Sequence, residues 1–433
     1  MANQVNPPRG MRDFLPAEKA RRERVLAVIR DTYRAHGFDE IETPVVEDSA
    51  RLHAGLGGDN EKLAFGILKR GLTADDLAAA TDPLDLADLG LRFDLTVPLT
   101  RFYARHRAEL PSVFRAIQLG SVWRAERPQK GRYRQFVQCD IDVIGDATGL
   151  AEAELIVASL ATFDALGLDG VTMRINDRRI LTGLLDHFGF AAGEHASVLI
   201  TLDKLDKVGP DGVVAELTGN EATPDAVAAL RSYLTRPQTS EFNPYGEKQI
   251  RKALPDDFDS PAIADLIALG ETVSGALPEH ADNGIPLAFD PFLVRGMGYY
   301  TGMIFEAMHP SAGYSLGGGG RYDGMIGRFL GTEVPATGFS IGFERIVDLV
   351  ALGDGDKADA VVLLYGDDTD PDRLVALKAE LIGQGKRVRL ERTPRNVKGL
   401  LDALAASGYA QFVQVGDATA AADLTLKPLS AGS

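Results

Sequence analysis

The sequence predicts an α+β fold that carries a helical insertion and ends in a smaller α/β domain. Two runs that alternate apolar and polar residues within 122–143 enclose a turn, as the strands of an antiparallel hairpin do. Helical but interrupted spacing fills residues 178–286, between two strand-rich segments. After residue 360, strands alternate with helices, which indicates a small domain with a largely parallel sheet.

Composition narrows the class of protein. The chain has 433 residues, enough for two or three domains, and 45% of them are hydrophobic, which is ordinary for a globular protein. No apolar run approaches the roughly 20 residues needed to cross a bilayer. Residues 1–14 lack the apolar core of a secretory signal. We therefore expect a cytoplasmic protein with no membrane association.

The cysteine and histidine content and the net charge narrow the class of protein further. Cys139 is the single cysteine, which excludes an intramolecular disulfide framework. The seven histidines are scattered without the spacing of metal ligands, so we predict no metal held by the protein itself. The net charge of -16 argues against a nonspecific nucleic-acid binder. A nucleic-acid partner would have to bind local basic patches.

Residue spacing places the elements of the first third of the chain. Residues from about 16 to 36 have apolar positions at helical intervals, and Gly37 is well placed to end that helix. Residues 38–47 alternate as a strand does, and Pro44 within them suits an edge or an interface. Residues 89–106 are expected to form a strand and then a helix.

The remaining elements give the domain boundaries. A helix at 151–166 and a strand at 171–177 complete the first part of the main domain, residues 1–175. A helical insertion follows at 176–286, with a loop at 236–249. The main domain resumes at 287–350. Residues 351–360 are small and acidic, which is typical of a linker, and 361–433 form the α/β domain.

The hairpin at 122–143 carries the most informative functional pattern. Arg124 and Glu126 share one face of its first run, and Gln138, Asp140 and Asp142 share one face of its second. The turn between them is basic, with Arg127, Lys130, Arg132 and Arg134. Arginine forks suit phosphate oxygens. A solvated basic hairpin is the simpler alternative, but solvation does not require the carboxylates and the glutamine, so the pattern favours a polyanion site.

Three later segments add candidate site residues. Arg295 stands beside glycines and is followed by Tyr299 and Tyr300, and glycines allow a backbone to approach a bound molecule closely. Four glycines precede Arg321 and Tyr322. Residues 336–350 are expected to run from a strand into a helix with Arg345 near its start, where a helix dipole favours phosphate. Packed tyrosines and a surface arginine remain the alternatives.

Together these segments resemble the class II aminoacyl-tRNA synthetases, and specifically the histidyl-tRNA synthetase family. Residues 124–136 are similar to motif 2, GFSIGFER at 338–345 to motif 3, and the first helix with 38–47 to motif 1. The signals specific to the histidine family occur in order: RGMRDFLP at 9–16, LRFDLT at 91–96, RPQKGRYRQF at 127–136, LVRGMGYYTG at 293–302 and GGRYDG at 319–324. The resemblance implies a class II catalytic domain whose antiparallel sheet is flanked by helices.

The resemblance also implies roles for individual residues. ATP would be bound by Arg124 at the α-phosphate, Glu126 at the adenine amino group, Phe136 stacked on adenine, and Arg132 and Arg345 at the outer phosphates. Histidine would be bound by Asp94, Thr96, Gln138, Asp142, Arg295, Tyr299, Tyr300 and Tyr322. Arg295 and Arg124 would be catalytic, since both would stabilise the α-phosphate under attack. Mg²⁺ would bridge the ATP phosphates, tRNA(His) would be the second substrate, and the motif 1 resemblance implies a homodimer.

The chain departs from the family pattern at two places. Gly298 stands where most members have an aspartate, and the α/β domain is expected to be shorter than usual, which leaves anticodon recognition open. Two alternatives to histidine–tRNA ligase therefore remain. One is a paralogue that forms histidyl-adenylate for a non-tRNA acceptor. The other is a non-catalytic regulatory subunit of histidine biosynthesis, against which the retained Arg124, Arg295 and Arg345 argue.

Overall fold

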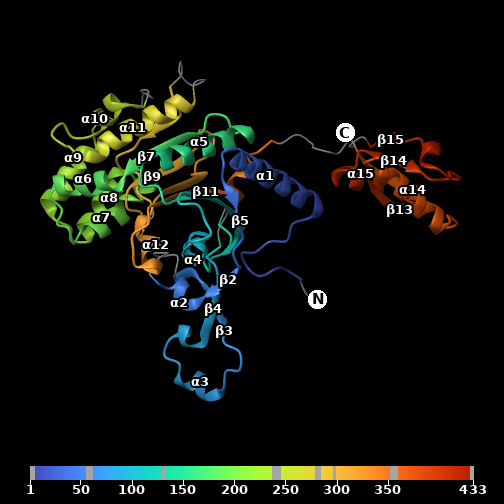
Figure 1. Cartoon of the computed structure of the whole chain (residues 1–433), viewed down its shortest axis with the longest axis horizontal. Coiled ribbons are helices and arrows are strands. Elements are labelled where there is room, and N and C mark those ends of the chain that lie inside the picture. Colours follow the sequence, from blue (N-terminus) through green and yellow to red (C-terminus); the bar gives the residue numbers. More distant parts are fainter. Residues whose placement is uncertain are drawn as a thin grey trace. The chain divides into compact units, whose positions relative to one another are not determined.

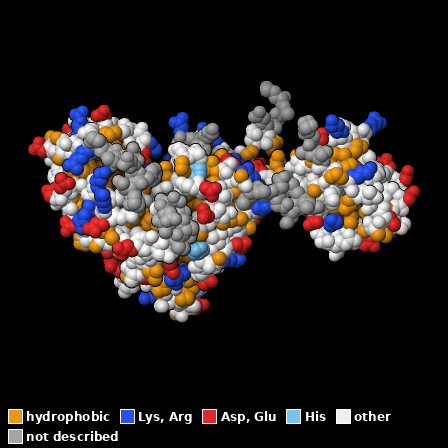
Figure 2. Space-filling view, turned by 90° about the horizontal axis from the view of Figure 1, so that it is seen from above, with side chains coloured by type: hydrophobic (Ala, Val, Ile, Leu, Met, Phe, Trp, Pro, Cys, Tyr) orange, Lys and Arg blue, Asp and Glu red, His pale blue; other side chains and the backbone are white. Residues whose placement is uncertain are grey.

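A computed structural model describes residues 5–54, 62–128, 132–236, 245–277, 284–295, 299–351 and 359–429. The chain divides into two compact units. The larger comprises residues 1–12 and 26–350, and the smaller comprises residues 351–433 together with 13–25. None of the described helices is long and apolar enough to cross a membrane. Figure 2 shows acidic and basic side chains interspersed on the face that it displays.

An eight-stranded sheet forms the centre of the larger unit (Figure 1). Its strands lie in the order β1 (Asp39–Glu40), β5 (Phe114–Trp123), β6 (Gln135–Ile144), β11 (Ala336–Gly342), β10 (Gly317–Arg321), β9 (Met303–Met308), β7 (Thr172–Asp177) and β8 (Leu287–Phe289). Only the outer pairs, β1 with β5 and β7 with β8, are parallel in the described sheet. The predicted antiparallel sheet of an α+β fold is thus confirmed.

The first strand of the hairpin lies earlier than the sequence predicted. β5 ends at Trp123, paired with Gln135 of β6, so the expected strand face of Arg124 and Glu126 was wrong. Beyond that pair the backbone donors diverge: the Arg124 N–H donates to the Arg134 carbonyl at 2.9 Å, and the Ala125 N–H donates to the Leu63 carbonyl at 2.7 Å. Because neighbouring residues bond to different segments, the regular ladder cannot continue.

The single strand predicted at 38–47 is also wrong, because the chain changes sheets there. β1 is the edge of the large sheet, whereas β2 (Val46–Asp48) belongs to a separate three-stranded sheet with β4 (Ala87–Leu91) and β3 (Phe65–Leu68). Pro44 lies between β1 and β2, and proline has no N–H to give to a ladder. The edge position expected for this segment is nevertheless present at β1.

Helices flank the sheet. The first helix, α1 (Pro16–Ala35), ends before Gly37, whose φ is 84°, a left-handed conformation that glycine adopts without strain. α5 (Leu150–Ala165) covers one face: Phe163 meets the Phe339 ring edge-on at 6.5 Å, and Phe339 stacks on Phe305 of β9 at 6.0 Å. The other helices against this core are α2 (Ser49–Leu52), α4 (Thr96–His106), α12 (Asp323–Leu330) and α13 (Phe343–Ile346), with α3 (Ala74–Ala79) near the small sheet.

Helices also fill the predicted insertion, and Figure 1 shows them gathered beside the large sheet. They are α6 (Arg178–Phe188), α7 (His195–Leu202), α8 (Leu205–Gly219), α9 (Pro224–Leu234), α10 (Glu247–Ala253) and α11 (Pro261–Ala276). The predicted loop at 236–249 is shorter than expected at its far end, because α10 already begins at Glu247; residues 237–244 lie outside the described part.

The smaller unit contains a four-stranded sheet in the order β13 (Arg387–Arg392), β12 (Ala360–Tyr365), β14 (Gln411–Gln414) and β15 (Lys427–Pro428). The first three strands are parallel, and β15 is antiparallel. α14 (Pro371–Gly383) and α15 (Val397–Ala406) contribute to two separate apolar clusters that share β12. The predicted α/β domain with a largely parallel sheet is confirmed. Most of the predicted linker, 352–358, lies outside the described residues.

Candidate active site

A cavity of about 1140 Å³ opens in the larger unit, over β6, β10 and β11. The residues to which the family resemblance gives a role all line it: Asp94, Thr96, Arg124, Glu126, Arg132, Phe136, Gln138, Asp142, Arg295, Tyr299, Tyr300, Tyr322 and Arg345. Arg134 and Arg321 do not line it: Arg134 Nε donates to the Glu126 carbonyl at 2.9 Å, and Arg321 Nε pairs with Glu152 at 2.6 Å. Gly298 and Lys130 lie outside the described residues. Segments more than 200 residues apart in the chain thus contribute to one site.

The deep end of the cavity is built on the polar face of β6. Asp142 pairs in register with Gly338 of β11, where an added Cβ would lie 2.0 Å from an Asp142 carboxylate oxygen. Only glycine therefore leaves room for this carboxyl group at that position. The Tyr322 hydroxyl donates to Asp142 Oδ1 at 2.5 Å. Burial raises the pKa of Asp142 to about 7.

Asp140 lies on the same face of β6, two residues before Asp142. Burial, and then the nearby Asp142, raise the pKa of Asp140 well above its usual range. The Gln138 amide donates to the Asp140 carboxyl at 3.4 Å and to the Ser340 hydroxyl at 3.2 Å. The deep end therefore combines carboxyl, amide and hydroxyl groups that lie close enough for the protonation of one to affect the others.

Two tyrosines close this end. The hydroxyls of Tyr299 and Tyr300 lie 3.5 Å apart, and their rings are 4.4 Å apart at their centroids. Burial raises the pKa of both phenols, so each keeps its proton and can donate. Asp94 stands at the start of α4, where its carboxylate accepts the Val97 N–H at 3.1 Å. A carboxylate fixed in this way can also accept from an ammonium group.

The opposite end of the cavity is lined by arginines. The Arg124 Nε donates to the Phe93 carbonyl at 2.9 Å, and its guanidinium lies 5.1 Å from the centre of the Phe136 ring. Arg132 Nη1 approaches Glu126 Oε2 at 3.4 Å. Arg124 thus lies near an aromatic ring, and Arg132 is an exposed cation beside Glu126.

Arg345 adds a third cation. Its Nη1 donates to the Ser315 carbonyl at 2.7 Å. Burial lowers the pKa of its guanidinium, and the nearby Arg295 and Arg132 lower it further, as expected where like charges converge. The expected run from a strand into a helix is present, because β11 ends at Gly342 and α13 begins at Phe343. α13 has only four residues, and a contribution of its dipole to phosphate binding stays a prediction.

Arg295 lies between the two ends. Its Nη1 pairs with Glu306 and lies 3.5 Å from the Ser315 hydroxyl. A Cβ on Gly318 would lie 2.5 Å from the Arg295 guanidinium carbon, so the glycine-rich strand β10 provides the space in which this arginine lies. Glu306 of β9 faces Gly318 of β10 on one side and Arg174 of β7 on the other. Arg295, which lies outside the strands, is thus paired with a glutamate of the central sheet.

Sequence patterns missed several residues of this site. Glu306 carries no motif signal beyond its place in a strand, because its partner Arg295 is eleven residues away. Asp203 reaches the cavity from the helical insertion, at the end of α7, and burial raises the pKa of its carboxyl group. Among the described residues, no group of three or more histidine, cysteine, aspartate or glutamate side chains is placed to hold a metal ion.

A family model described as histidyl-tRNA synthetase matches residues 10–346. The chain belongs to this family. It is 60% identical to a histidine–tRNA ligase of Leifsonia xyli subsp. xyli, over 99% of this chain and 100% of that protein. It is 38% identical to the ligase of Aeropyrum pernix, over 79% of this chain and 73% of that protein. The resemblance predicted from the motifs is confirmed.

Solved structures agree on the fold. The histidyl-tRNA synthetase of Nostoc sp. PCC 7120 superposes with a TM-score of 0.75 at 26% identity, over 99% of this chain and 96% of that one. A Bacillus halodurans protein described as an ATP phosphoribosyltransferase regulatory subunit/histidyl-tRNA synthetase has a TM-score of 0.72 at 21% identity, over 95% and 98% of the two chains. At that identity the second match shows the fold alone.

Proposed function

We propose that this protein activates L-histidine with ATP to form histidyl-adenylate and transfers the histidyl group to the 3′ end of tRNA(His). The observation that carries the proposal is the single cavity, in which a buried polar end and an arginine-lined end meet at Arg295. Family membership supports the same reaction. The site residues keep the roles expected from the family resemblance.

The buried end suits the amino acid. Asp142, joined to Tyr322, would offer a carboxyl oxygen to an imidazole N–H, while Asp94, Thr96 and Gln138, which line the same cavity, would bind the α-amino group. A ligand without an imidazole would leave these buried groups without partners, and that is a strong means of discrimination. Tyr299 and Tyr300 add two phenol hydroxyls to the same end, and burial raises the pKa of both.

The arginine end suits ATP and the first chemical step. The histidine carboxylate attacks the α-phosphorus, pyrophosphate leaves, and negative charge grows on the α-phosphoryl oxygens. Arg295 and Arg124 would stabilise that charge, since fixed cations act most strongly where charge develops. Arg132 and Arg345 would bind the departing phosphates. No protein nucleophile is needed.

Magnesium would enter with ATP as part of the substrate. Mg²⁺ usually keeps several waters and binds through substrate phosphates rather than a protein cage. A cytoplasmic homodimer completes the proposal, with β1 and α1 as the segments similar to motif 1.

Aminoacylation of purified tRNA(His) with labelled histidine and ATP tests the proposal, with an anticodon-substituted tRNA as the comparison. Robust charging of the wild-type tRNA supports it, and weaker charging of the substituted tRNA would show that the α/β domain reads the anticodon. Histidine-dependent pyrophosphate exchange without charging would favour the paralogue that uses a non-tRNA acceptor. Loss of both activities in folded protein would favour the regulatory subunit.

A further inference from the structure

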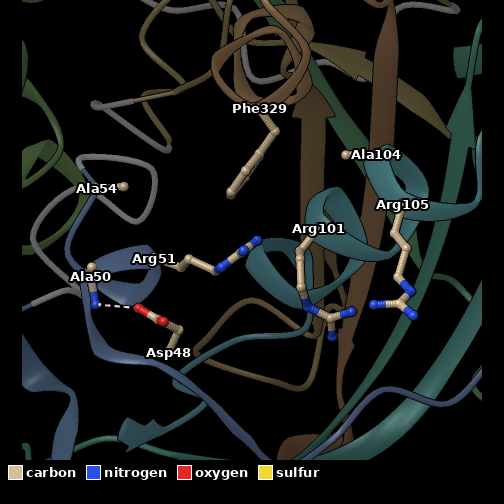
Figure 3. A pocket seen from close by; sticks show the side chains of 8 residues that line it. All are labelled: Asp48, Ala50, Arg51, Ala54, Arg101, Ala104, Arg105 and Phe329. Atoms are coloured by element: carbon tan, nitrogen blue, oxygen red, sulfur yellow. Dashed lines mark hydrogen bonds between the residues drawn. The ribbon is translucent and has the colours of Figure 1, made fainter. Parts of the chain in front are cut away.

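A second cavity, of about 670 Å³, lies in the larger unit and shares no lining residue with the site described above; Figure 3 shows it from close by. It is framed by α2, α4 and α12, and its lining residues are Asp48, Ala50, Arg51, Ala54, Arg101, Ala104, Arg105 and Phe329. Thr96, at the start of α4, lines the active site, whereas Arg105 lies nine residues further along. That spacing is about 14 Å along a helix axis.

Positive charge dominates this arginine cavity. Figure 3 shows Arg101 and Arg105 directed the same way from one helix, as residues four apart must be, and Arg51 reaching toward them from α2. Arg101 Nε pairs with Glu47 at 2.6 Å, and the Asp48 carboxylate already accepts the Ala50 N–H at 2.9 Å. Two carboxylates thus lie near three guanidinium groups, and each of the two also accepts a backbone N–H, Glu47 from Asp48 at 3.2 Å and Asp48 from Ala50.

The remaining donors are unused within the described chain. Neither Arg51 nor Arg105 makes an ion pair or hydrogen bond with a described residue; the guanidinium of Arg51 lies 5.9 Å from the centre of the Phe329 ring. Arg101 Nη2 is buried and has no hydrogen-bond partner among the described residues. An arginine at the end of a helix can simply complement the helix dipole. That explanation does not apply to Arg51, because α2 has only four residues.

The net charge of the protein makes the group of Arg51, Arg101 and Arg105 unusual. That net charge is -16, so an uncompensated group of arginines is not a consequence of a basic composition. Phe329 and three alanines complete the lining, so the arginines are the only cations among the residues that line this cavity. Guanidinium groups that converge from two helices match an anion with oxygens in several directions, and tetrahedral phosphate fits better than a planar carboxylate.

We propose that the arginine cavity is a second anion site, which binds a compact phosphate-bearing ligand through Arg51, Arg101 and Arg105. Its volume exceeds that of a single phosphate, so two or more linked phosphates fit it best. Free pyrophosphate and the phosphodiester backbone of a nucleic acid share this chemistry, and the experiment separates them. The site is distinct from the ATP phosphates' place at Arg132 and Arg345.

The variants are Arg51→Gln, Arg105→Gln and the double change, in the full-length protein. Arg101 is left intact, because its loss would strand the buried Glu47 carboxylate and could prevent folding. Arg107→Gln is the matched control: it removes the same charge from the end of the same helix, at a residue that does not line the cavity. Circular dichroism confirms that each variant is folded.

The first arm is a calorimetric titration with inorganic pyrophosphate. Saturating histidine and an ATP analogue that cannot be cleaved at the α–β bond fill the active site beforehand. We expect one saturable binding event in the wild type and in Arg107→Gln, weakened at least about tenfold in the double variant. Affinity that is equal in all variants, or no binding event together with a negative second arm, would overturn the proposal.

The second arm measures tRNA affinity against salt concentration. If the cavity binds backbone phosphate, Arg51→Gln and Arg105→Gln lower the slope of log affinity against log salt by about one contact each, and Arg107→Gln does not. A change in this arm alone identifies the nucleic acid as the source, and a change in the first arm alone identifies the free phosphate. If the variants shift only the monomer–dimer equilibrium in light scattering, carboxylates of a second copy occupy the cavity and the proposal is wrong.

Discussion

The two ends of the active-site cavity differ in how they bind a charged substrate. At the histidine end, Asp140 and Asp142 are each 4% exposed and Tyr322 is 2% exposed. At the ATP end, the Arg132 side chain is 53% exposed. Burial makes each hydrogen bond of the histidine end costly to break, whereas solvent weakens a single exposed charge. We therefore propose that selectivity resides at the buried end and that the arginines bind and release the phosphates.

The largest effect should come from the residue at which the two ends meet. Arg295→His should lower histidine-dependent pyrophosphate exchange by at least about a thousandfold, since a fixed cation aimed at developing charge is lost. Pyrophosphate exchange measures it, and an unchanged melting temperature shows that the fold is intact. Near-normal exchange would remove Arg295 from the proposed mechanism.

A change at the buried end should act mainly on histidine. Asp142→Asn replaces a group that accepts from Tyr322 and faces the proposed imidazole, so kcat/KM for histidine should fall about a hundredfold. The KM for ATP should stay within about twofold, because the arginine end is unchanged. Equal losses for histidine and ATP would contradict the division between the two ends.

Glu306 should position Arg295 without touching substrate. Glu306→Gln removes the ion pair across the sheet, and we expect kcat for exchange to fall about tenfold while KM for ATP changes little, because misplacement of a catalytic group costs rate. Glu154→Gln, which removes the half-buried partner of Arg115, is the control for losing such a pair. If both variants lose the same activity, Glu306 has only a structural role.

A substitution at the exposed, arginine-lined end should reduce activity less than one at the buried end. Arg132→Gln should raise the KM for ATP by a few-fold and leave KM for histidine unchanged, since an exposed cation contributes only about 1 kcal/mol or less. Steady-state exchange at varied ATP measures it. A hundredfold loss would show that this arginine becomes buried when ATP binds.

The pH dependence of stability should also separate the two ends. The pKa of Asp142 is raised to about 7 by burial, so the folded protein retains a proton that the unfolded chain loses near pH 4. This contribution to stability is complete below pH 4 and is lost as pH rises through 7. Asp142→Asn should therefore flatten the denaturant stability curve between pH 4 and 7. An unchanged curve would contradict the burial argument.

Local sequence was sufficient to predict the polar face of β6 and the α/β domain. Gln138, Asp140 and Asp142 alternate with apolar residues, and that period depends only on strand geometry. It was not sufficient for β5, whose residues from Phe114 onward are partly buried on both faces and show no alternation. Tertiary pairing, rather than local pattern, ended that strand at Trp123.

The family motifs named the residues of the site, but not what supports them. Asp203 reaches the cavity from the helical insertion, and Glu306 supports it through its ion pair with Arg295; neither relation has a local signature. The glycines of β10 were visible in the sequence, yet their purpose required the position of Arg295. Arg51 of α2 and Arg105 of α4 likewise line one cavity, although more than fifty residues separate them in the sequence.

The most direct test of the central claim is exchange of labelled pyrophosphate into ATP by the purified protein, with each amino acid supplied in turn. A buried end built for imidazole predicts exchange with L-histidine and background levels with the others. Exchange supported equally by other amino acids, or by none, would contradict the assignment of this cavity to histidine activation.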